Sequence, residues 1–234
     1  SGNLAGTGHH KRAGEAHAEI RALEHAADRT LGSTLYVTLE PCNHQGSTPP
    51  CVDTILKAGI KRVVVGCRDP NPHVTGGGIE RLRDSGVTVD VGVLEAECSA
   101  LIEPWSTFIV SGMPFVAIKL ALSLDGRIAT RSGASRWVTG PEARAKVQEL
   151  RAQSDAIAVG VGTALADDPL LTVRDPDFRG RAPRRIVFDS QLRLPPTSRL
   201  AGTAAEVPVL ILTTLDAPEE REQALVAEGC EVVR

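Results

Sequence analysis

The chain is poor in aromatic residues and carries little net charge. Tryptophan, tyrosine and phenylalanine make up 3% of its 234 residues, and its formal net charge is −3 at pH 7. Proteins that bind nucleic acids neutralise phosphates with basic residues and stack bases on aromatic rings. The composition gives neither feature, so we expect no nucleic-acid partner.

Long apolar runs are also absent, since none approaches the ~20 residues that a membrane-spanning helix needs. The first residues of the sequence show no signal peptide. Five cysteines, an odd number in a chain of this length, argue against a secreted disulfide framework. We therefore expect a cytoplasmic protein with no membrane partner, in which Cys67, Cys98 and Cys230 are core thiols.

Short β-branched runs alternate with helical patterns along the chain, which is typical of an α/β protein. We expect strands over residues 34–38, 62–66, 87–91, 115–122, 156–161, 185–189 and 207–213, and helices near 15–28, 51–58, 76–85 and 141–153. The segment Ser111-Gly112-Met113-Pro114, with its serine, glycine and proline, is the best candidate for a domain boundary. It predicts two domains, residues 1–111 and 112–234.

The chain also contains residues that could form a catalytic metal site. His17-Ala18-Glu19, Pro41-Cys42 and Cys51 supply one imidazole, two thiols and a carboxylate. An open zinc site takes three protein ligands and leaves a position for water, whose pKa the metal lowers from ~15.7 to about 7. The pattern predicts hydrolytic deamination, with His17, Cys42 and Cys51 as ligands and Glu19 as the catalytic proton carrier.

Helix geometry restricts where these residues can lie. Side chains two positions apart point ~200° apart on a regular helix. We therefore expect His17 and Glu19 to lie over the first turn of a helix that begins near Ala16. Pro49 and Pro50 predict a second helix start at Cys51, where the positive end of the helix would lower the pKa of that thiol.

Each residue also has an ordinary structural interpretation. A lone histidine near a helix start is usually a surface residue, and free cysteines are among the most buried residue types. Together they match the His-x-Glu, Pro-Cys and Cys signature of zinc deaminases, although eight residues rather than two separate Cys42 from Cys51. His44 is the close candidate for a fourth ligand, which would make the site structural instead of catalytic.

Longer motifs extend this match. They are Ala13-Gly14-Glu15-Ala16-His17-Ala18-Glu19, Thr38-Leu39-Glu40-Pro41-Cys42-Asn43-His44, Thr48-Pro49-Pro50-Cys51, Asp69-Pro70-Asn71-Pro72, Ser123-Leu124-Asp125-Gly126 and Ala166-Asp167-Asp168-Pro169. The chain resembles, over essentially its whole length, the bifunctional deaminase/reductase family of riboflavin biosynthesis, in which the Cys-to-Cys loop is long. The resemblance implies a cytidine-deaminase-like three-layer sandwich followed by a dihydrofolate-reductase-like domain.

The same resemblance implies two reactions on a small molecule. Zinc-dependent deamination of diaminohydroxyphosphoribosylaminopyrimidine is followed by NADPH reduction of the ribosyl group of 5-amino-6-(5-phosphoribosylamino)uracil to ribityl. The implied NADPH contacts are Ala121, Trp137, Thr163, Asp167 and Ser190. The implied substrate contacts are His10 and His44 in the first domain and Ser135, Arg151, Leu171 and Arg174 in the second. Two arginines suit a sugar phosphate, because guanidinium binds phosphate bidentately.

Some features depart from the expected patterns. Gly160-Val161-Gly162 lacks the third glycine of a dinucleotide fingerprint, so we expect only a tight strand-to-loop turn there. Ser47 stands where the family usually has a basic residue near the substrate phosphate. The family also extends before Gly2 and beyond Arg234, so we expect this sequence to be part of a longer protein.

Other functions remain open at this stage. The alternatives are a single-function nucleoside or transfer-RNA deaminase, a zinc-stabilised module without catalysis, and a degenerate family member that holds metal without turnover. Because family enzymes commonly oligomerise, we expect at least a homodimer.

Overall fold

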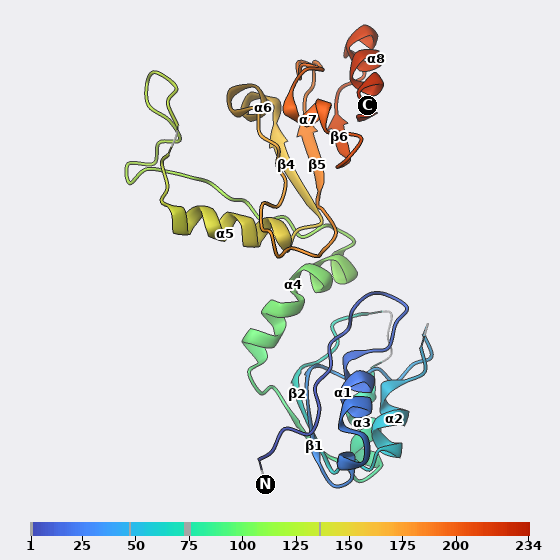
Figure 1. The fold of residues 1–234 in the computed structure, drawn as a ribbon. Helices are drawn as coiled ribbons and strands as arrows, with labels where there is room; N and C mark the ends of the chain where they lie inside the picture. Colours follow the sequence, from blue (N-terminus) through green and yellow to red (C-terminus); the bar gives the residue numbers. More distant parts are fainter. Residues whose placement is uncertain (1, 47, 73–75, 136) are drawn as a thin grey trace. The chain divides into compact units, whose positions relative to one another are not determined.

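The computed structural model describes residues 2–46, 48–72, 76–135 and 137–234. The chain divides into two compact units, Ser1–Ile118 and Lys119–Arg234, each with its own parallel sheet (Figure 1). Helix α4 ends at Ser111, the last residue of the first predicted domain, and the first unit continues for a short segment beyond it. No helix of the described ranges is long and apolar enough to cross a membrane.

The elements follow one another in α/β alternation. The first unit contains α1 (Ala18–Ala26), the 3₁₀ turn η1 (Ala27–Thr30), β1 (Thr34–Leu39), α2 (Cys51–Lys57), β2 (Arg62–Cys67), α3 (Gly78–Asp84), β3 (Thr88–Val91) and α4 (Glu95–Ser111). The second contains α5 (Pro141–Ala152), β4 (Ala156–Gly160), α6 (Val161–Asp167), β5 (Arg184–Phe188), α7 (Arg199–Gly202), β6 (Val209–Leu212), α8 (Glu219–Ala227) and β7 (Glu231–Val233). The predicted α/β class is confirmed.

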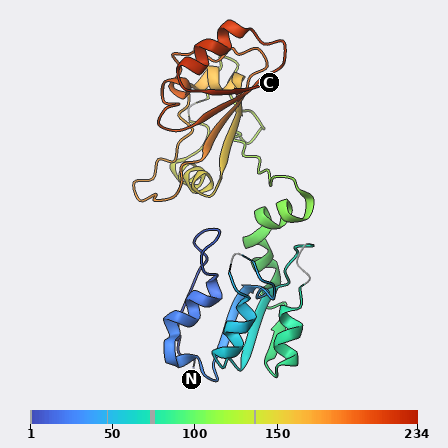
Figure 2. The ribbon, with the colours of Figure 1, turned by 90° about the vertical axis from the view of Figure 1, so that its right-hand side faces the viewer.

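The sheet of the first unit is covered on both faces. Its order is β1-β2-β3, and helices α1, α2 and α3 lie beside it (Figure 2). Val63 and Val65 of the central strand pack into a core shared with these helices. On the opposite face, Gly66 admits α4: a Cβ at Gly66 would lie 2.2 Å from the Cys98 sulfur. Side chains alternate across a strand, so β2 has one face for each helix layer. This is the predicted three-layer sandwich.

The sheet of the second unit has the order β4-β5-β6-β7, with all pairs parallel. Val187 and Ile211 on its two central strands are fully buried against Leu200 of α7 and Leu225 of α8. Parallel strands are usually buried and rich in β-branched residues, as these are. The thiols predicted to lie in the core, Cys67, Cys98 and Cys230, are indeed free and buried.

Two sequence expectations about secondary structure are wrong. Residues 115–122 form no strand, and the alternate side chains Val116, Ile118 and Leu120 are exposed. Strand propensity is context-dependent, and this segment forms no ladder with β4 to β7. Gly160 leads directly into helix α6 instead of a loop, because its backbone is extended and serves as the N-cap.

Candidate active sites

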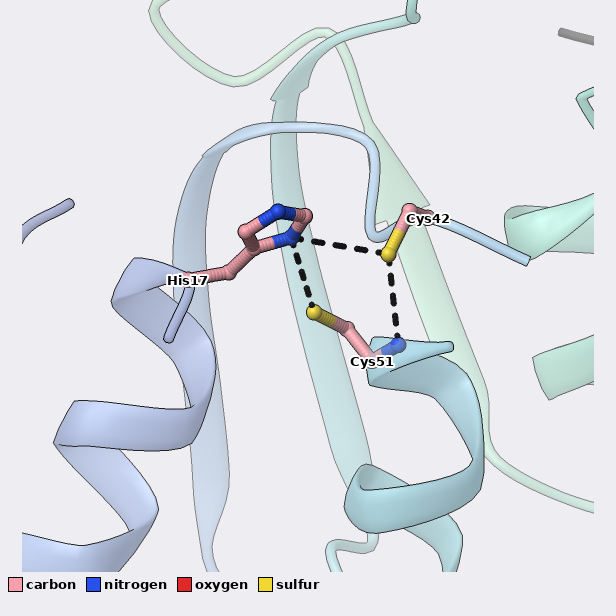
Figure 3. A group of neighbouring side chains, drawn as sticks. All are labelled: His17, Cys42 and Cys51. Carbon is pink, nitrogen blue, oxygen red and sulfur yellow. Dashed lines mark hydrogen bonds between the residues drawn. The ribbon is translucent and has the colours of Figure 1, made fainter. Parts of the chain in front are cut away.

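Three metal-ligating side chains meet at the carboxyl end of the first sheet. The His17 Nδ1 lies 3.3 Å from the Cys51 sulfur and 3.5 Å from the Cys42 sulfur (Figure 3). All three ligand atoms lie within 4.8 Å of one another. Among the described residues, this group does not include His44, so the fourth-ligand alternative has no geometric support. One imidazole and two thiols in an open cluster fit the donor set of catalytic zinc.

The chain delivers each ligand from the start or end of a regular element. His17 is the N-cap of α1, which begins two residues later than predicted near Ala16. Cys51 is the first residue of α2, as the preceding prolines predicted, and Cys42 follows closely on the end of β1. The backbone N–H of Val52 donates to the Cys42 carbonyl at 3.3 Å. Helix α2 therefore fixes both cysteines.

The electrostatics of the thiol pair correct one sequence expectation. Hydrogen bonding from Cys51, with the help of His17, lowers the pKa of the Cys42 thiol to about 5. The hydrogen bond to Cys42 and burial raise the pKa of Cys51 instead. The reason is local, because the first N–H of α2 points at the Cys42 sulfur at 3.3 Å, so the helix start stabilises the Cys42 thiolate. Zinc binds thiolates, so metal binding displaces the protons of the thiol ligands.

Glu19 lies in the first turn of α1, beside the cluster. Burial raises the pKa of its carboxyl group above the ordinary value, and contact with the Cys51 thiol opposes that shift. A hollow of about 360 Å³ opens at the metal-ligating residues, and it is lined by His17, Cys42 and the two expected substrate contacts His10 and His44. The His10 and His17 rings meet edge-on with centroids 5.3 Å apart. The other residue of interest, Ser47, lies outside the described residues.

Sequence reasoning missed a buried carboxylate that supports the cluster. Glu40 is 7% exposed, and its two oxygens accept backbone N–H bonds from Ile79 at 3.1 Å and Asp69 at 3.4 Å. These bonds join the end of β1 to the start of α3 and to the segment after β2, next to Cys42. A buried acid is rarely tolerated without such partners. The signal was an acidic residue at the end of a half-buried strand, directly before Pro41-Cys42.

In the second unit, two of the predicted substrate contacts form a cationic pair. Burial and the nearby positive charge of Arg174 lower the pKa of Arg151. The Arg151 guanidinium donates to the Thr172 carbonyl at 2.9 Å, which ties α5 to the loop that carries Leu171 and Arg174. Leu171 itself is buried and has a φ of 53°. Two close cations attract an anion, and guanidinium groups favour phosphate.

Trp137 lies on the same side of α5 as this loop. A hollow of about 600 Å³ is lined by Trp137, Arg174 and residues of α5. The Trp137 ring is 70% exposed, and the Arg144 guanidinium carbon lies 4.4 Å from its centroid. The structure therefore brings one expected NADPH contact and one expected substrate contact to a single hollow.

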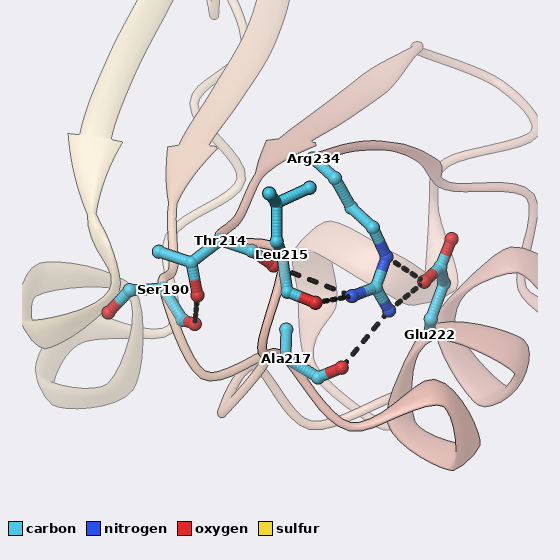
Figure 4. Close-up of polar contacts among 6 residues, drawn as sticks. All are labelled: Ser190, Thr214, Leu215, Ala217, Glu222 and Arg234. Carbon is cyan, nitrogen blue, oxygen red and sulfur yellow. Dashed lines mark hydrogen bonds and ion pairs between the residues drawn. The ribbon is translucent and has the colours of Figure 1, made fainter.

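The other expected NADPH contacts follow the strands or precede α5. Thr163 and Asp167 are exposed on α6, directly after β4, and Ser190 is exposed just after β5. The Ser190 carbonyl accepts a hydrogen bond from the Thr214 hydroxyl at 2.8 Å (Figure 4). Ligands of open α/β sheets bind at this carboxyl edge. Ala121 and Ser135 are half-buried in the irregular segment before α5, and their roles stay predictions.

The loop beside Ser190 is held from the opposite side by the last residue of the sequence. The Arg234 guanidinium donates to the carbonyls of Leu215 at 2.6 Å and Ala217 at 3.1 Å, and it pairs with Glu222 (Figure 4). These contacts fix the turn that follows β6. The same turn holds Ser190 in place through the hydrogen bond from the Thr214 hydroxyl.

Fold and site together define a zinc-deaminase domain followed by a reductase-type domain. Residues 1–67 match the family model of the cytidine and deoxycytidylate deaminase zinc-binding region, and residues 114–233 match that of the RibD C-terminal domain. The chain belongs to the RibD family of riboflavin biosynthesis proteins. This confirms the family and the fold that the sequence motifs predicted.

Curated relatives and solved structures agree with this assignment. The riboflavin biosynthesis protein RibD of Aquifex aeolicus is 43% identical over 99% of the chain and 64% of the relative, and that of Escherichia coli K12 is 46% identical over 88% and 59%. RibD of Acinetobacter baumannii has a TM-score of 0.81 at 39% identity, covering 99% of this chain and 64% of that one. The diaminohydroxyphosphoribosylaminopyrimidine deaminase/5-amino-6-(5-phosphoribosylamino)uracil reductase of Thermotoga maritima has a TM-score of 0.81 at 38% identity, covering 97% and 70%.

The chain spans 64% of the Aquifex relative and 59% of the Escherichia coli relative.

Proposed function

We propose that the chain provides both activities of a riboflavin-pathway deaminase/reductase. Residues 1–111 remove an amine from diaminohydroxyphosphoribosylaminopyrimidine by hydrolysis. Residues 112–234 contribute to NADPH reduction of the ribosyl group of the product, 5-amino-6-(5-phosphoribosylamino)uracil. The observation that carries the proposal is the open cluster of His17, Cys42 and Cys51 with the Glu19 carboxyl group beside it.

His17, Cys42 and Cys51 hold the zinc ion of the deaminase. When bound, the ion acts as a Lewis acid and lowers the pKa of water to about 7. The Glu19 carboxylate accepts a proton from the attacking water and returns it to the departing amine, so that ammonia leaves. Its raised pKa suits this exchange, because a general acid and base works best when its pKa lies near the operating pH.

The reductase contacts divide by chemistry. Arg151 and Arg174 bind the sugar phosphate, and Leu171 and Ser135 help to orient the substrate. Trp137 offers a flat apolar surface to the cofactor, with Ala121, Thr163, Asp167 and Ser190 as the remaining contacts. NADPH, when bound, supplies the hydride that reduces the anomeric carbon of the ring-opened ribose.

The proposal extends to the setting of the enzyme. The substrate is a small molecule, and the composition favours neither a nucleic-acid nor a membrane partner. We assign the enzyme to the cytoplasm and to a homo-oligomer, at least a dimer. Size measurement of the full-length protein by light scattering tests the oligomeric state.

The test of the two activities is a coupled assay on the full-length protein. It follows ammonia release and NADPH oxidation with the diaminopyrimidine ribotide as substrate. The proposal predicts both signals, with NADPH oxidation dependent on prior deamination. Ammonia release without NADPH oxidation would identify a single-function deaminase, and neither signal from zinc-loaded protein would identify a binding or degenerate role.

A further inference from the structure

One face of helix α5 contacts two loops that carry expected reductase contacts, the loop of Trp137 and the loop of Leu171 and Arg174. Arg144, Gln148 and Arg151 are spaced by four and three residues, so they lie on the same side of the helix. Each of the three contacts a loop. Only Arg151 belongs to the predicted substrate contacts, which leaves Arg144 and Gln148 without an assigned role.

Gln148 holds the loop of the cationic pair. Its amide oxygen accepts a hydrogen bond from the backbone N–H of Arg174 at 2.8 Å. One turn further along α5, Arg151 donates to the Thr172 carbonyl of the same loop at 2.9 Å. The loop backbone is therefore fixed at Thr172 and at Arg174, the two neighbours of Val173. A donor and an acceptor on one helix face together define the position of Arg174.

Arg144 holds the other loop. Its guanidinium donates to the Thr139 carbonyl at 2.7 Å and lies over the Trp137 ring, 4.4 Å from the centroid. The ring is otherwise largely exposed, so this stacking is a main restraint on its orientation. Cation–π contacts with Arg are favourable over tryptophan. Both Arg144 and Gln148 also line the hollow that Trp137 and Arg174 share.

We propose that Arg144 and Gln148 are positioning residues of the reductase: Arg144 sets Trp137 for the cofactor, and Gln148 sets Arg174 for the phosphate of the substrate. The proposal rests on the reductase half of the proposed function. It assigns to α5 the task of holding two loops at a fixed separation. Neither residue needs to touch the reacting atoms for this role.

The test compares variants on the same helix face with a matched control. Gln148→Met keeps the length of the side chain and removes the acceptor, and Arg144→Met removes the cation over Trp137. Lys146→Met removes a cation from an exposed position of α5, where it pairs with Glu149 at 2.6 Å. All three are made in the full-length protein, and their reductase kinetics are measured with the deaminated intermediate and NADPH.

Gln148→Met is expected to raise KM for the intermediate about fivefold, the effect of one net hydrogen bond, with little change in kcat. Arg144→Met is expected to raise KM for NADPH about threefold, as for loss of an exposed cation–π contact. Lys146→Met changes neither constant. A general loss of structure would lower kcat in all variants, so the split between the two KM values identifies positioning.

Fluorescence gives a readout that does not depend on turnover. The 234 residues contain two tryptophans, Trp105 and Trp137, so the Trp137 signal is taken as the difference from a matched Trp137→Phe variant. Arg144→Met should make Trp137 more accessible to acrylamide quenching, whereas Lys146→Met should not. If Gln148→Met and Arg144→Met are active and their KM values for the intermediate and NADPH are unchanged, the positioning roles are overturned but the proposed function is not. Wild-type protein without NADPH oxidation would overturn the proposed function itself.

Discussion

The backbone of Gly78 packs directly on the carbonyl oxygen of Pro41. A Cβ built on Gly78 would lie 2.0 Å from that oxygen, which is closer than any real contact. The next residue of α3, Ile79, donates its N–H to the Glu40 carboxylate at 3.1 Å. The start of α3 therefore contacts both Glu40 and Pro41, the two residues that precede Cys42.

Gly78→Ala is expected to displace Pro41 and to lower the free energy of unfolding by about 1–3 kcal/mol, as overpacking does. Because Cys42 follows, zinc affinity should fall as well. Chemical denaturation and competition with a chelator measure the two effects. Gly202→Ala is the control, since a Cβ there meets no atom within 4 Å. Equal stability of the two variants would contradict the close packing at Gly78.

Metal content tests the ligand cluster. We expect one zinc ion per chain, lost on Cys51→Ala and retained on Cys98→Ala, because Cys98 packs on Gly66 away from the ligands. Metal analysis of the purified variants measures this. Removing zinc that is present at ~100 times its Kd should also cost about 2.7 kcal/mol of stability. Full zinc in Cys51→Ala would show that the metal is held elsewhere.

The cationic pair of the second unit should bind phosphate. Arg174→Met is expected to raise KM for the phosphorylated intermediate by roughly tenfold or more, since charge-assisted hydrogen bonds contribute about 1.5–3 kcal/mol. Arg181→Met, an exposed neighbour in sequence, should leave KM unchanged. Steady-state kinetics with the intermediate at saturating NADPH provide the comparison. An unchanged KM in Arg174→Met would remove the pair from the substrate site.

Arg185 is fully buried on β5, and its guanidinium donates to the carbonyls of Leu170, Thr203 and Val207. Arg185→Met leaves the Leu170 and Val207 carbonyls without this donor, while the Thr203 carbonyl keeps the backbone N–H groups of Glu206 and Val207. We expect a loss of about 2–6 kcal/mol in the free energy of unfolding, because each unsatisfied buried acceptor costs about 1–3 kcal/mol.

The adjacent Arg184 supplies the control for this prediction. It pairs with Glu231 at the surface, so Arg184→Met should cost at most about 1 kcal/mol. Urea denaturation of the two variants gives the comparison. Losses of similar size would mean that the buried hydrogen bonds of Arg185 contribute little to stability.

The sequence was sufficient for the zinc cluster because its residues are chemically distinctive and lie at element starts that prolines and apolar spacing mark. It was insufficient where tertiary packing decides. Helix α4 was missed because Pro104 lies within it and reads as a helix breaker. Residues 115–122 have strand propensity and no partner strand in the described structure, so their pattern predicted the wrong element.

Supporting residues were harder to predict than ligands. Glu40, Gln148 and Arg185 act through backbone groups that are distant in sequence, and such contacts leave no local pattern. The pKa of Cys51 was predicted in the wrong direction for a similar reason. The helix start was placed correctly, but its N–H points at the sulfur of Cys42.

The most direct test of the central claim replaces the proton carrier while leaving the metal ligands intact. Glu19→Gln is compared with Glu24→Gln, the same change on the exposed side of α1, and zinc content and ammonia release are measured on each. The account predicts full zinc in both, and a fall in ammonia release of ~100-fold or more for Glu19→Gln alone. NADPH oxidation by that variant should return when the deaminated intermediate is supplied. Ammonia release by Glu19→Gln at the wild-type rate would contradict the account.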